Sequence, residues 1–397
     1  MIIIIELVGA IKMARTQMVA SFGRRRFLGG AAAGTALLAA PAIASTGVEV
    51  VDIAGRTVSL KAPARRIILG EGRLMYGFSV LQPAKPFERL VGWGDDMALF
   101  DPGTYRQYRT KHPSGDKVPR FGSAVNSDFS VERAIAVNPD LVLFPLSAYQ
   151  RQIQAGTFDK LQRAGIPAAV VDLREALAQN TQPSIEIMGA LLGLDGEAAA
   201  FNRFYLRETR RVSSAVWNMP ANKRTTVFME RAAGFDPNNC CMTFGNANLG
   251  VTLQDAGGIN WGAARFPGIG GTASPEAILT LDPEAIIGTG ADWSESTPGS
   301  SGVPFGYETT QAQVQAALKA LTERPGWSAL RAVRSKRFYS IYHQFYTSPA
   351  HLVAMQVFAK WLYPEQFAGL DPDAVWQEYH ARFSPIPLSG VFWAQLA

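Results

Sequence analysis

The sequence predicts an α/β protein made of two similarly wound three-layer lobes with mainly parallel sheets, joined by a single long interlobe helix. Three observations lead to this prediction. Short apolar strand patterns alternate with helical patterns along most of the chain. One helix–turn–strand pattern occurs twice, and a long helical segment separates the two copies. The length of 397 residues is enough for two domains of ordinary size.

Residues 1–44 are expected to be an export signal that is removed from the folded protein. The stretch "GRRRFLGGAAAGTALLAAPAIAS" has three arginines, then small apolar residues, then the A-x-A pattern Ala42–Ala44 that is typical of signal cleavage. Its R-R-x-F-L order is similar to a twin-arginine signal, although glycines stand at the flanking positions. A retained membrane anchor is the alternative, but the run is too short to span a bilayer comfortably. We therefore expect a periplasmic protein, cleaved near Ala44.

The N-terminal segment also carries most of the excess charge. The whole chain has 38 basic and 33 acidic residues, and residues 1–44 hold five of the basic and one of the acidic ones. The remaining chain has a net charge of +1, so bulk charge gives no support for nucleic-acid binding. A hydrophobic content of 47% indicates a globular fold.

Residues 45–195 are expected to form the N-terminal lobe. The stretch "VEVVDIAGRTVSL" alternates around Ala54–Gly55, which predicts a hairpin. Short apolar runs at 65–70 and 89–96 end in glycine or Gly-Trp-Gly, as expected for buried parallel strands. A helix at 131–137, a turn and a strand at 141–144 follow, and "KLQRAGIPAAVVDL" adds another helix, turn and strand.

Residues 196–218 are predicted to form the helix that joins the lobes. This segment contains no proline, no internal glycine, and apolar residues at helical spacing. It would extend about 35 Å at 1.5 Å per residue, which exceeds the length of an average helix. A helix of that length can bridge two lobes.

Residues 219–397 are expected to form the C-terminal lobe. Strands are predicted at 225–230, at 285–287 and in "KRFYSIY", and "TLQDAGGINWG" predicts a helix that stops at two glycines. A final helix is predicted in "SPAHLVAMQVFAKWLYPEQF". The duplicated pattern is "SVERAIAVNPDLVLF" from Ser130 and "SPEAILTLDPEAIIG" from Ser274. Two copies indicate two similar lobes, and chance convergence of two such units is the alternative.

The two cysteines, Cys240 and Cys241, are neighbours in the sequence. An oxidising compartment would permit a disulfide between them, although adjacent residues reach disulfide geometry with difficulty. Two reduced, packed thiols are the alternative. A structural zinc site is not expected, because no nearby cluster of histidines and cysteines supplies four ligands.

The chain resembles the periplasmic substrate-binding proteins of ABC importers, in the branch that binds ferric siderophores and vitamin B12. The resemblance rests on "SVERAIAVNPDLVLF", "VVDIAGRTVSLKAPARRII", "LQDAGGINW" and "RPGWSALRAVRSKRFYSIYHQFYTSP", and on the order in which they occur. It covers nearly all of Val48–Phe367. The resemblance implies a cleft between the lobes, a rigid connecting helix and a ferric siderophore as ligand. It also implies an ABC permease dimer as partner, a monomer, and no cofactor beyond the chelated iron.

Ligands of open α/β sheets bind beyond the carboxyl ends of the strands, and this rule selects candidate residues. In the N-terminal lobe these are Glu71, Arg73, Tyr76, Trp93, Ser123, Asn126, Tyr149 and Arg174. In the C-terminal lobe they are Glu230, Arg231, Phe244, Asn246, Trp293, His343 and Tyr346, and the last strand end also offers Gln344. Guanidinium groups suit an anionic chelate, and aromatic side chains suit its rings.

Each candidate also has a structural explanation. Arg73 and Arg231 are expected to face each other across the cleft, but each could instead pair with the adjacent Glu71 or Glu230. The two tryptophans could be ordinary core residues, and His343 a core or loop residue rather than a metal ligand. Cobalamin or haem on the same scaffold is the alternative ligand, with Tyr346 or His343 as the axial group of haem.

Direct metal binding and catalysis are not expected. The four histidines do not form a cluster of the kind that binds free zinc or manganese. We find no phosphate-binding loop, dinucleotide fingerprint or nucleophile elbow. A secreted α/β hydrolase that acts on a siderophore-like ligand is the only enzyme considered, and it has no recognisable catalytic triad.

The duplicated pattern places one glutamate in the first turn of each helix, Glu132 and Glu276. Acidic residues there are stabilised by the helix N-terminus, which alone would explain them. The resemblance implies a second role, because in siderophore and B12 systems one acidic residue of each lobe meets an arginine of the permease. We therefore expect Glu132 and Glu276 to dock the two lobes on the permease.

Overall fold

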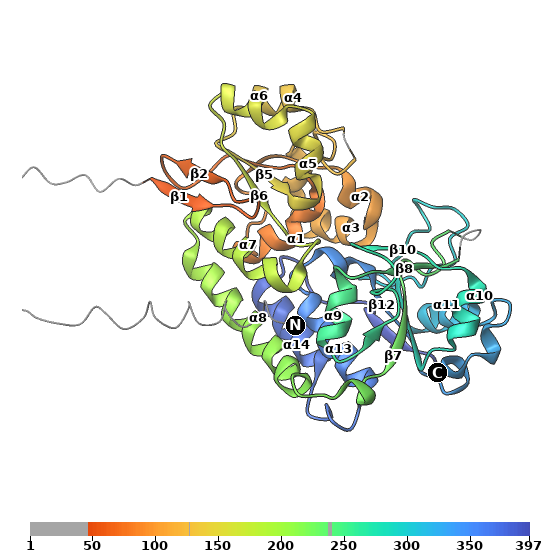
Figure 1. Cartoon of the computed structure of the whole chain (residues 1–397). Coiled ribbons are helices and arrows are strands. Elements are labelled where there is room, and N and C mark those ends of the chain that lie inside the picture. Colours follow the sequence, from red (N-terminus) through yellow and green to blue (C-terminus); the bar gives the residue numbers. More distant parts are fainter. Residues whose placement is uncertain (1–46, 127, 237–239) are drawn as a thin grey trace, which may run out of the picture. The chain divides into compact units, whose positions relative to one another are not determined.

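The computed structural model describes residues 47–126, 128–236 and 240–397. The expected export signal and its cleavage site lie outside these residues. The described residues form two α/β lobes, each built around its own sheet (Figure 1). Nowhere in the described part of the chain is a helix both long and apolar enough to cross a bilayer.

The N-terminal lobe contains a four-stranded sheet in the order β4–β3–β5–β6, and all its strands are parallel. The hairpin predicted around Gly55 is confirmed as an antiparallel pair of strands, and Gly55 has a positive φ of 78°. The strands of this lobe are β1 (Val48–Val51), β2 (Thr57–Leu60), β3 (Ile67–Leu69), β4 (Leu90–Trp93), β5 (Leu141–Pro145) and β6 (Ala168–Val171).

Alternate residues of the N-terminal sheet enter two different hydrophobic cores. Val142 and Phe144 of β5 pack with α4, α5 and α6, whereas Leu141 and Leu143 enter the core that contains α7. This gives the three-layer arrangement predicted from the sequence. The helices on the two faces are α4 (Val131–Ala136), α5 (Leu146–Gln154), α6 (Thr157–Arg163) and α7 (Leu177–Leu192).

Several short helical segments follow the first two strands of this sheet and approach the other lobe. Their sequence patterns are too brief to predict, and most are single turns. They are η1 (Gly72–Leu74), α1 (Met75–Phe78), η2 (Ser79–Leu81), α2 (Asp96–Phe100), α3 (Pro102–Lys111) and η3 (Pro113–Lys117).

The predicted interlobe helix is α8, Asp195–Val216. Its apolar residues Phe201, Phe204 and Tyr205 are buried in one core that contains residues of both lobes. The helix packs on α7 and η2 of the N-terminal lobe and on α9 and α13 of the C-terminal lobe. It therefore contributes to the core of both lobes instead of acting only as a connection.

The C-terminal sheet has a parallel centre and antiparallel edges. Its order is β10–β8–β7–β11–β12–β13, with β9 paired to β7. Strands β7, β11 and β12 are parallel, whereas β8, β10 and β13 join antiparallel. The strands are β7 (Thr226–Glu230), β8 (Met242–Phe244), β9 (Ile259–Asn260), β10 (Gly270–Thr272), β11 (Ala285–Gly290), β12 (Phe338–Tyr342) and β13 (Trp393–Gln395).

The helix predicted within 348–367 is confirmed, but it is not the final element, because another helix and a strand follow it. Asp371 accepts a hydrogen bond from the backbone N–H of Ala374 and so caps a new helix that begins at Pro372. The helices of this lobe are α9 (Leu249–Asp255), α10 (Pro275–Leu281), α11 (Gln311–Thr322), α12 (Arg331–Arg334), α13 (His351–Leu362) and α14 (Pro372–Phe383), with short turns η4 (Ala221–Lys223), η5 (Trp327–Ala329) and η6 (His343–Thr347).

The duplicated sequence pattern forms the same structure in both lobes. It is α4 followed by β5 in one lobe and α10 followed by β11 in the other. Each helix begins at a serine whose hydroxyl accepts a backbone hydrogen bond, Ser130 from Arg133 and Ser274 from Ala277. Each resulting strand lies at the centre of its parallel set, β5 between β3 and β6, and β11 between β7 and β12.

The turns of the two copies are also equivalent. Asn138 and Asp282 both adopt the left-handed conformation, with φ of 49° and 41°. Two residues later, the carboxylate of Asp140 accepts backbone hydrogen bonds from Arg65 and Arg66, just before β3. Glu284 accepts one from Thr226 at the start of β7. The repeated pattern thus fixes the neighbouring strand as well as its own helix and strand.

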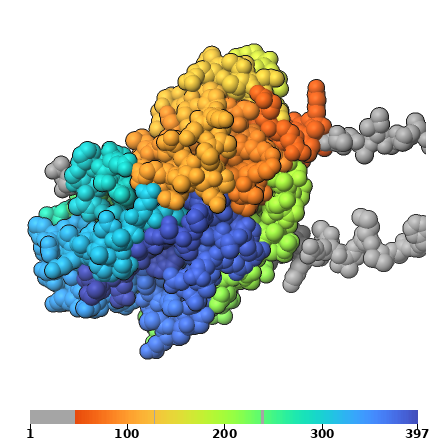
Figure 2. Space-filling model, turned by 180° about the vertical axis from the view of Figure 1, so that it is seen from behind, coloured from red at the N-terminus to blue at the C-terminus, as the bar shows by residue number. Residues whose placement is uncertain are grey.

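The two lobes are in direct contact. Figure 2 shows C-terminal segments, in blue, lying against the orange N-terminal lobe. One such contact joins the ring Nε2 of His112 and the carbonyl of Pro385, 2.8 Å apart. The boundary between the lobes is where the carboxyl ends of the central strands meet.

Candidate ligand-binding site

A cavity of about 270 Å³ lies between the two lobes. It is lined by six of the residues predicted from the strand ends, Gln344 included. The lining residues are Arg73 and Phe100 from the N-terminal lobe and Arg231, Ala232, Phe235, Met242, Trp293, His343, Gln344 and Tyr346 from the C-terminal lobe. Most of these directly follow the ends of strands β3, β7, β11 and β12, which is why the strand-end rule found them.

Arg73 is held in a buried network of charges. Its Nε donates to Asp96 at 2.8 Å, and a terminal nitrogen lies 3.0 Å from Glu71. Another terminal nitrogen donates to the hydroxyl of Tyr346 across the lobe boundary at 2.5 Å. Arg174 also pairs with Glu71, so two guanidinium groups face two carboxylates. Arg73 therefore pairs with Glu71, which was the structural alternative to a role in ligand binding.

Arg231 has no such partner. The adjacent Glu230 is engaged by Arg324, whose terminal nitrogen lies 2.8 Å from both carboxylate oxygens. Among the described residues, no carboxylate forms an ion pair with Arg231, and its Nε is buried without an acceptor. Arg231 therefore does not form the ion pair with Glu230 that was the structural alternative for this residue. Arg231 thus brings to the cavity wall a positive charge that has no ion-pair partner in the described part of the chain.

The two titratable rings of the cavity are shifted toward their unprotonated forms. Burial lowers the pKa of His343 well below its usual value, and Arg231 lowers it further, so the imidazole is neutral at pH 7. Burial raises the pKa of Tyr346, but Arg174 and Arg73 outweigh this effect and the net direction is downward. The hydroxyl of Thr289 lies 2.8 Å from Nδ1 of His343 and holds its ring in place.

Aromatic rings form a continuous wall on the C-terminal side. The ring centres of Phe235 and Trp293 are 5.0 Å apart, those of Trp293 and His343 are 5.3 Å apart, and those of His343 and Tyr346 are 4.5 Å apart. Phe100 faces the cavity from the other lobe, and its carbonyl accepts a 2.6 Å hydrogen bond from Gln344. These rings offer rigid apolar faces to a ligand.

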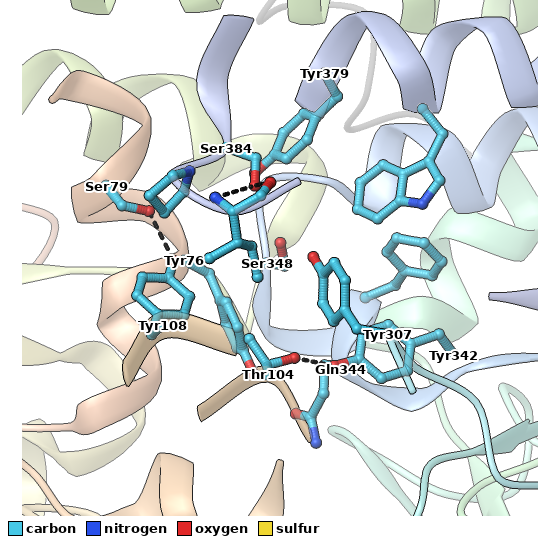
Figure 3. A pocket seen from close by; sticks show the side chains of 14 residues that line it. Tyr76, Ser79, Thr104, Tyr108, Tyr307, Tyr342, Gln344, Ser348, Tyr379 and Ser384 are labelled. Carbon is cyan, nitrogen blue, oxygen red and sulfur yellow. Dashed lines mark hydrogen bonds between the residues drawn. The ribbon is translucent and has the colours of Figure 1, made fainter. Parts of the chain in front are cut away.

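A second, water-sized cavity lies beside the first, between the lobes (Figure 3). Its volume is about 30 Å³ and tyrosine, serine and threonine hydroxyls line much of it. Tyr76 and Tyr342 both donate to the buried carboxylate of Asp101, and the hydroxyl of Thr104 lies 2.8 Å from that of Tyr342. Tyr76, predicted to contact the ligand, is instead part of this network between the lobes.

Three further candidates of the N-terminal lobe lie behind or away from the cavity. Glu71 and Arg174 belong to the charge network around Arg73 and do not line the cavity. Trp93 is buried in the core, where its ring lies 5.2 Å from that of Phe87. The prediction of a strand-end position was right for Trp93, but its side chain points into the lobe.

The remaining candidates of this lobe occupy structural positions. Ser123 is buried, and its backbone N–H donates to Asp128. Asn126 is exposed in the same loop. The ring of Tyr149 lies 5.4 Å from that of Phe158, on the face of the sheet that α6 covers.

In the C-terminal lobe, three candidates are also absent from the cavity lining. Glu230 pairs with Arg324 and does not line the cavity. Phe244 is fully buried, and the exposed Asn246 accepts a hydrogen bond from the backbone of Gly268. None of these three side chains lines the cavity.

Sequence reasoning missed four residues of the cavity. Ala232 and Phe235 lie one and four positions after Arg231. The strand-end rule would have included them if it had been applied to more residues after β7. Met242 begins β8 and Phe100 ends α2, two short elements that no sequence pattern had predicted. Their place in the cavity depends on how these elements pack.

The structure joins Cys240 and Cys241 by a disulfide. In the described part of the chain, these two sulfurs and the carboxylate of Glu230 are the only His, Cys, Asp or Glu side chains close enough together to share a metal. Arg324 already pairs with Glu230, and none of the three residues lines the interlobe cavity.

Two α/β lobes that enclose a charged and aromatic cavity at the carboxyl ends of their strands define a bilobal ligand-binding protein. Residues 84–344 match the family described as periplasmic binding protein, and the chain belongs to that family. It is a periplasmic substrate-binding protein of an ABC importer. Members of this class bind substrates for a membrane permease and are not enzymes.

Three known proteins illustrate the similarity. The TroA-like periplasmic binding protein FepB from Veillonella parvula is 28% identical, with a TM-score of 0.80 over 88% of this chain and 100% of its own. YvrC of Bacillus subtilis, an uncharacterised ABC transporter substrate-binding lipoprotein, is 24% identical over 257 residues, 63% of this chain and 69% of YvrC. The haem-binding protein RhuT from Roseiflexus is 18% identical with a TM-score of 0.53, over 76% of this chain and 99% of its own, and shows similarity of fold alone.

Proposed function

We propose that this protein captures a ferric siderophore or a similar anionic metal chelate in the interlobe cavity and delivers it to an ABC permease. The observation that carries the proposal is Arg231, a cation without an ion-pair partner among the described residues, in a cavity walled by aromatic rings. A guanidinium group binds carboxylate, hydroxamate or catecholate oxygens, and the rings pack against the chelator. Iron would arrive as part of the ligand, not as a resident cofactor.

The size of the cavity favours a compact ligand. Its volume of about 270 Å³ is near the lower end of the range for small-molecule sites. Two of its walls belong to different lobes, so a small separation of the lobes would enlarge it. A large chelate would need such a separation or would extend beyond the cavity mouth.

Haem is the second candidate, and one observation favours it. Tyr346 and His343 lie side by side in the cavity, and the pKa of each is shifted so that the unprotonated form is more accessible. Phenolate and imidazole are the usual protein ligands of haem iron. Cobalamin would need neither a cation nor an axial side chain, so no feature of the cavity favours it.

Native mass spectrometry of the protein purified from the periplasm of its own organism tests the ligand class. We expect a bound mass that contains iron and whose release leaves an iron-free chelator. A haem absorbance spectrum would favour the second candidate, and a ligand that contains no metal would contradict both.

Titration of the purified protein provides an independent test. Trp293 lines the cavity, so a bound ferric chelate should quench its fluorescence. The variant Trp293→Phe should lose that part of the quenching, whereas Trp217→Phe, which changes an exposed tryptophan outside the cavity, should not. Equal quenching in wild type and Trp293→Phe would place the ligand elsewhere.

A further inference from the structure

The cavity contains two arginines whose surroundings differ. Three separate nitrogens of Arg73 are engaged, by Asp96, Tyr346 and Glu71. The charge of this arginine is balanced inside the protein, because Arg73 and Arg174 together face Glu71 and Asp96. A ligand would have to displace one of these three residues to form a bidentate contact with Arg73.

The guanidinium of Arg231 has the opposite character. Its backbone N–H is used by β8, at 2.8 Å from the carbonyl of Met242, but no described residue accepts a hydrogen bond from its side chain. Arg231 is also the charged group with the largest effect on His343, after burial itself. It therefore retains both its charge and its donors for a ligand.

Two other ionisable groups, each next to a lining residue in the chain, have partners among the described residues. Glu230 forms an ion pair with Arg324. The carboxylate of Asp101 accepts hydrogen bonds from Tyr76 and Tyr342. Neutral His343 adds no charge, and the remaining wall at Phe100, Phe235, Met242 and Trp293 is apolar.

From this charge distribution we infer that the ligand carries one anionic group, which Arg231 binds on the C-terminal side, and that the cavity discriminates against chelates with several anionic groups. This inference rests on the proposed function. A second or third buried anionic group would have no unpaired cation to bind among the described residues that line the cavity, and burial of an unpaired charge is strongly unfavourable. The body of the ligand packs against the aromatic wall, so the class is a compact, monoanionic metal chelate.

Three synthetic ferric chelates test this selectivity. The first is a neutral ferric tris-hydroxamate, the second is the same complex with one free carboxylate, and the third is a ferric tris-catecholate with three negative charges. We expect the monoanionic complex to bind at least roughly tenfold more tightly than either of the others, the effect of one charge-assisted contact.

Substitution of Arg231 identifies the group responsible. Arg231→Gln should weaken binding of the monoanionic complex roughly tenfold to a hundredfold and make it equal to the neutral one. Arg231→Lys keeps the positive charge but loses the bidentate geometry of the guanidinium group. It should bind the three chelates in the same order of affinity as wild type, but more weakly. Arg265→Gln removes an exposed arginine of the same lobe, which lies over Trp261, and should change nothing. Circular dichroism and thermal unfolding establish that each variant is folded.

The possible results separate the two proposals. Equal affinity for the three chelates, or tightest binding of the tris-catecholate, would overturn the single-anion inference and leave the chelate function intact. If folded Arg231→Gln still bound the monoanionic chelate most tightly, the inference would also be overturned, because a group other than Arg231 would then bind the anionic group. Failure of all three chelates to bind wild-type protein would contradict the proposed function itself.

Discussion

Arg106 and Glu308 belong to different lobes and form an ion pair across the boundary between them. Nη2 of Arg106 lies 2.6 Å from Oε2 of Glu308, and Nη1 lies 2.7 Å from Glu295. Arg106 is on α3, whereas both glutamates lie in the segment between β11 and α11. Trp293 of the cavity wall belongs to the same segment, so the ion pairs connect the N-terminal lobe to the wall around the ligand.

We predict that Arg106→Gln accelerates ligand release. Partly exposed ion pairs contribute about 0.2–1 kcal/mol each, so loss of two should raise the dissociation rate by roughly twofold to thirtyfold. Salt should raise the rate in wild type and have less effect in the variant, because salt screens exposed charges. Stopped-flow fluorescence with a ferric chelate measures both effects.

Arg109→Gln is the matched control for this prediction. Arg109 is on the same helix but pairs with Asp116 of its own lobe, 2.5 Å away. Its loss should leave the dissociation rate unchanged. Equal rates and equal salt dependence in all three proteins would show that the Arg106 ion pairs do not restrain the lobes.

We predict that Glu132 and Glu276 together are needed for delivery to the permease. Both are exposed in the first turns of the equivalent helices α4 and α10, and Glu132 also pairs with Lys160 at 2.9 Å. Reversal of both charges to lysine should leave ligand affinity within a few-fold. Uptake through the permease should fall steeply, because like charges would then oppose each other at docking.

A second double variant controls for charge reversal in general. Glu88→Lys with Glu365→Lys also changes two exposed glutamates, one of which pairs with a lysine, Lys85, at 2.9 Å. We expect normal uptake from that protein. Normal uptake by the Glu132→Lys, Glu276→Lys protein would leave only stabilisation of the helix N-termini, and loss of ligand binding would place these residues in the cleft.

The disulfide between Cys240 and Cys241 predicts that the exported protein has no free thiol. Alkylation under denaturing conditions, followed by mass spectrometry, should add no label to the untreated protein and two labels after reduction. Two labels without reduction would show that both cysteines are thiols in the exported protein.

Two buried histidines predict that the protein is less stable in acid. Burial lowers the pKa of His351 from 6.5 to about 3 and that of His380 from 6.5 to about 4. Below pH 6.5 the unfolded chain binds protons that the folded protein does not, so stability falls as the pH falls toward these values. Each histidine contributes a slope of up to about 1.4 kcal/mol per pH unit in that range.

Asp255 opposes this effect, since burial raises its pKa from 3.8 to about 6 and the folded protein then binds the extra proton. The contribution of one histidine is therefore measured by comparing a variant with wild type. The variant His351→Gln should show a shallower decline of the melting temperature with acid than wild type. An equal slope would mean that His351 is protonated in the folded protein.

Local patterns in the sequence were sufficient to predict the repeated unit. Ser130 and Ser274 cap their helices through bonds to residues three positions away. The apolar strands that follow need only a buried sheet around them. Because these signals lie within about fifteen residues of chain, they could be found twice and compared, and they predicted two similar lobes correctly.

The general rule for open α/β sheets also located part of the site. Arg73, Arg231, Trp293, His343 and Tyr346 line the cavity, as the strand-end positions predicted. The same rule selected residues that the structure places elsewhere, because a strand end specifies position along the chain but not the direction of the side chain. The short elements that carry Phe100 and Met242 had no pattern strong enough to predict.

The amino-acid sequence by itself determined the two α/β lobes, the helix between them and the strand ends from which most residues of the cavity wall come. Only the tertiary structure decided which charges remain available. Arg73 and Arg231 look alike in sequence, since Glu71 stands two residues before Arg73 and Glu230 directly precedes Arg231. Long-range packing brings Asp96 and Tyr346 to Arg73, whereas Arg324 arrives from another part of the lobe and occupies Glu230. Whether a charge is compensated depends on distances of a few ångströms between residues far apart in the chain, and no local pattern encodes those distances.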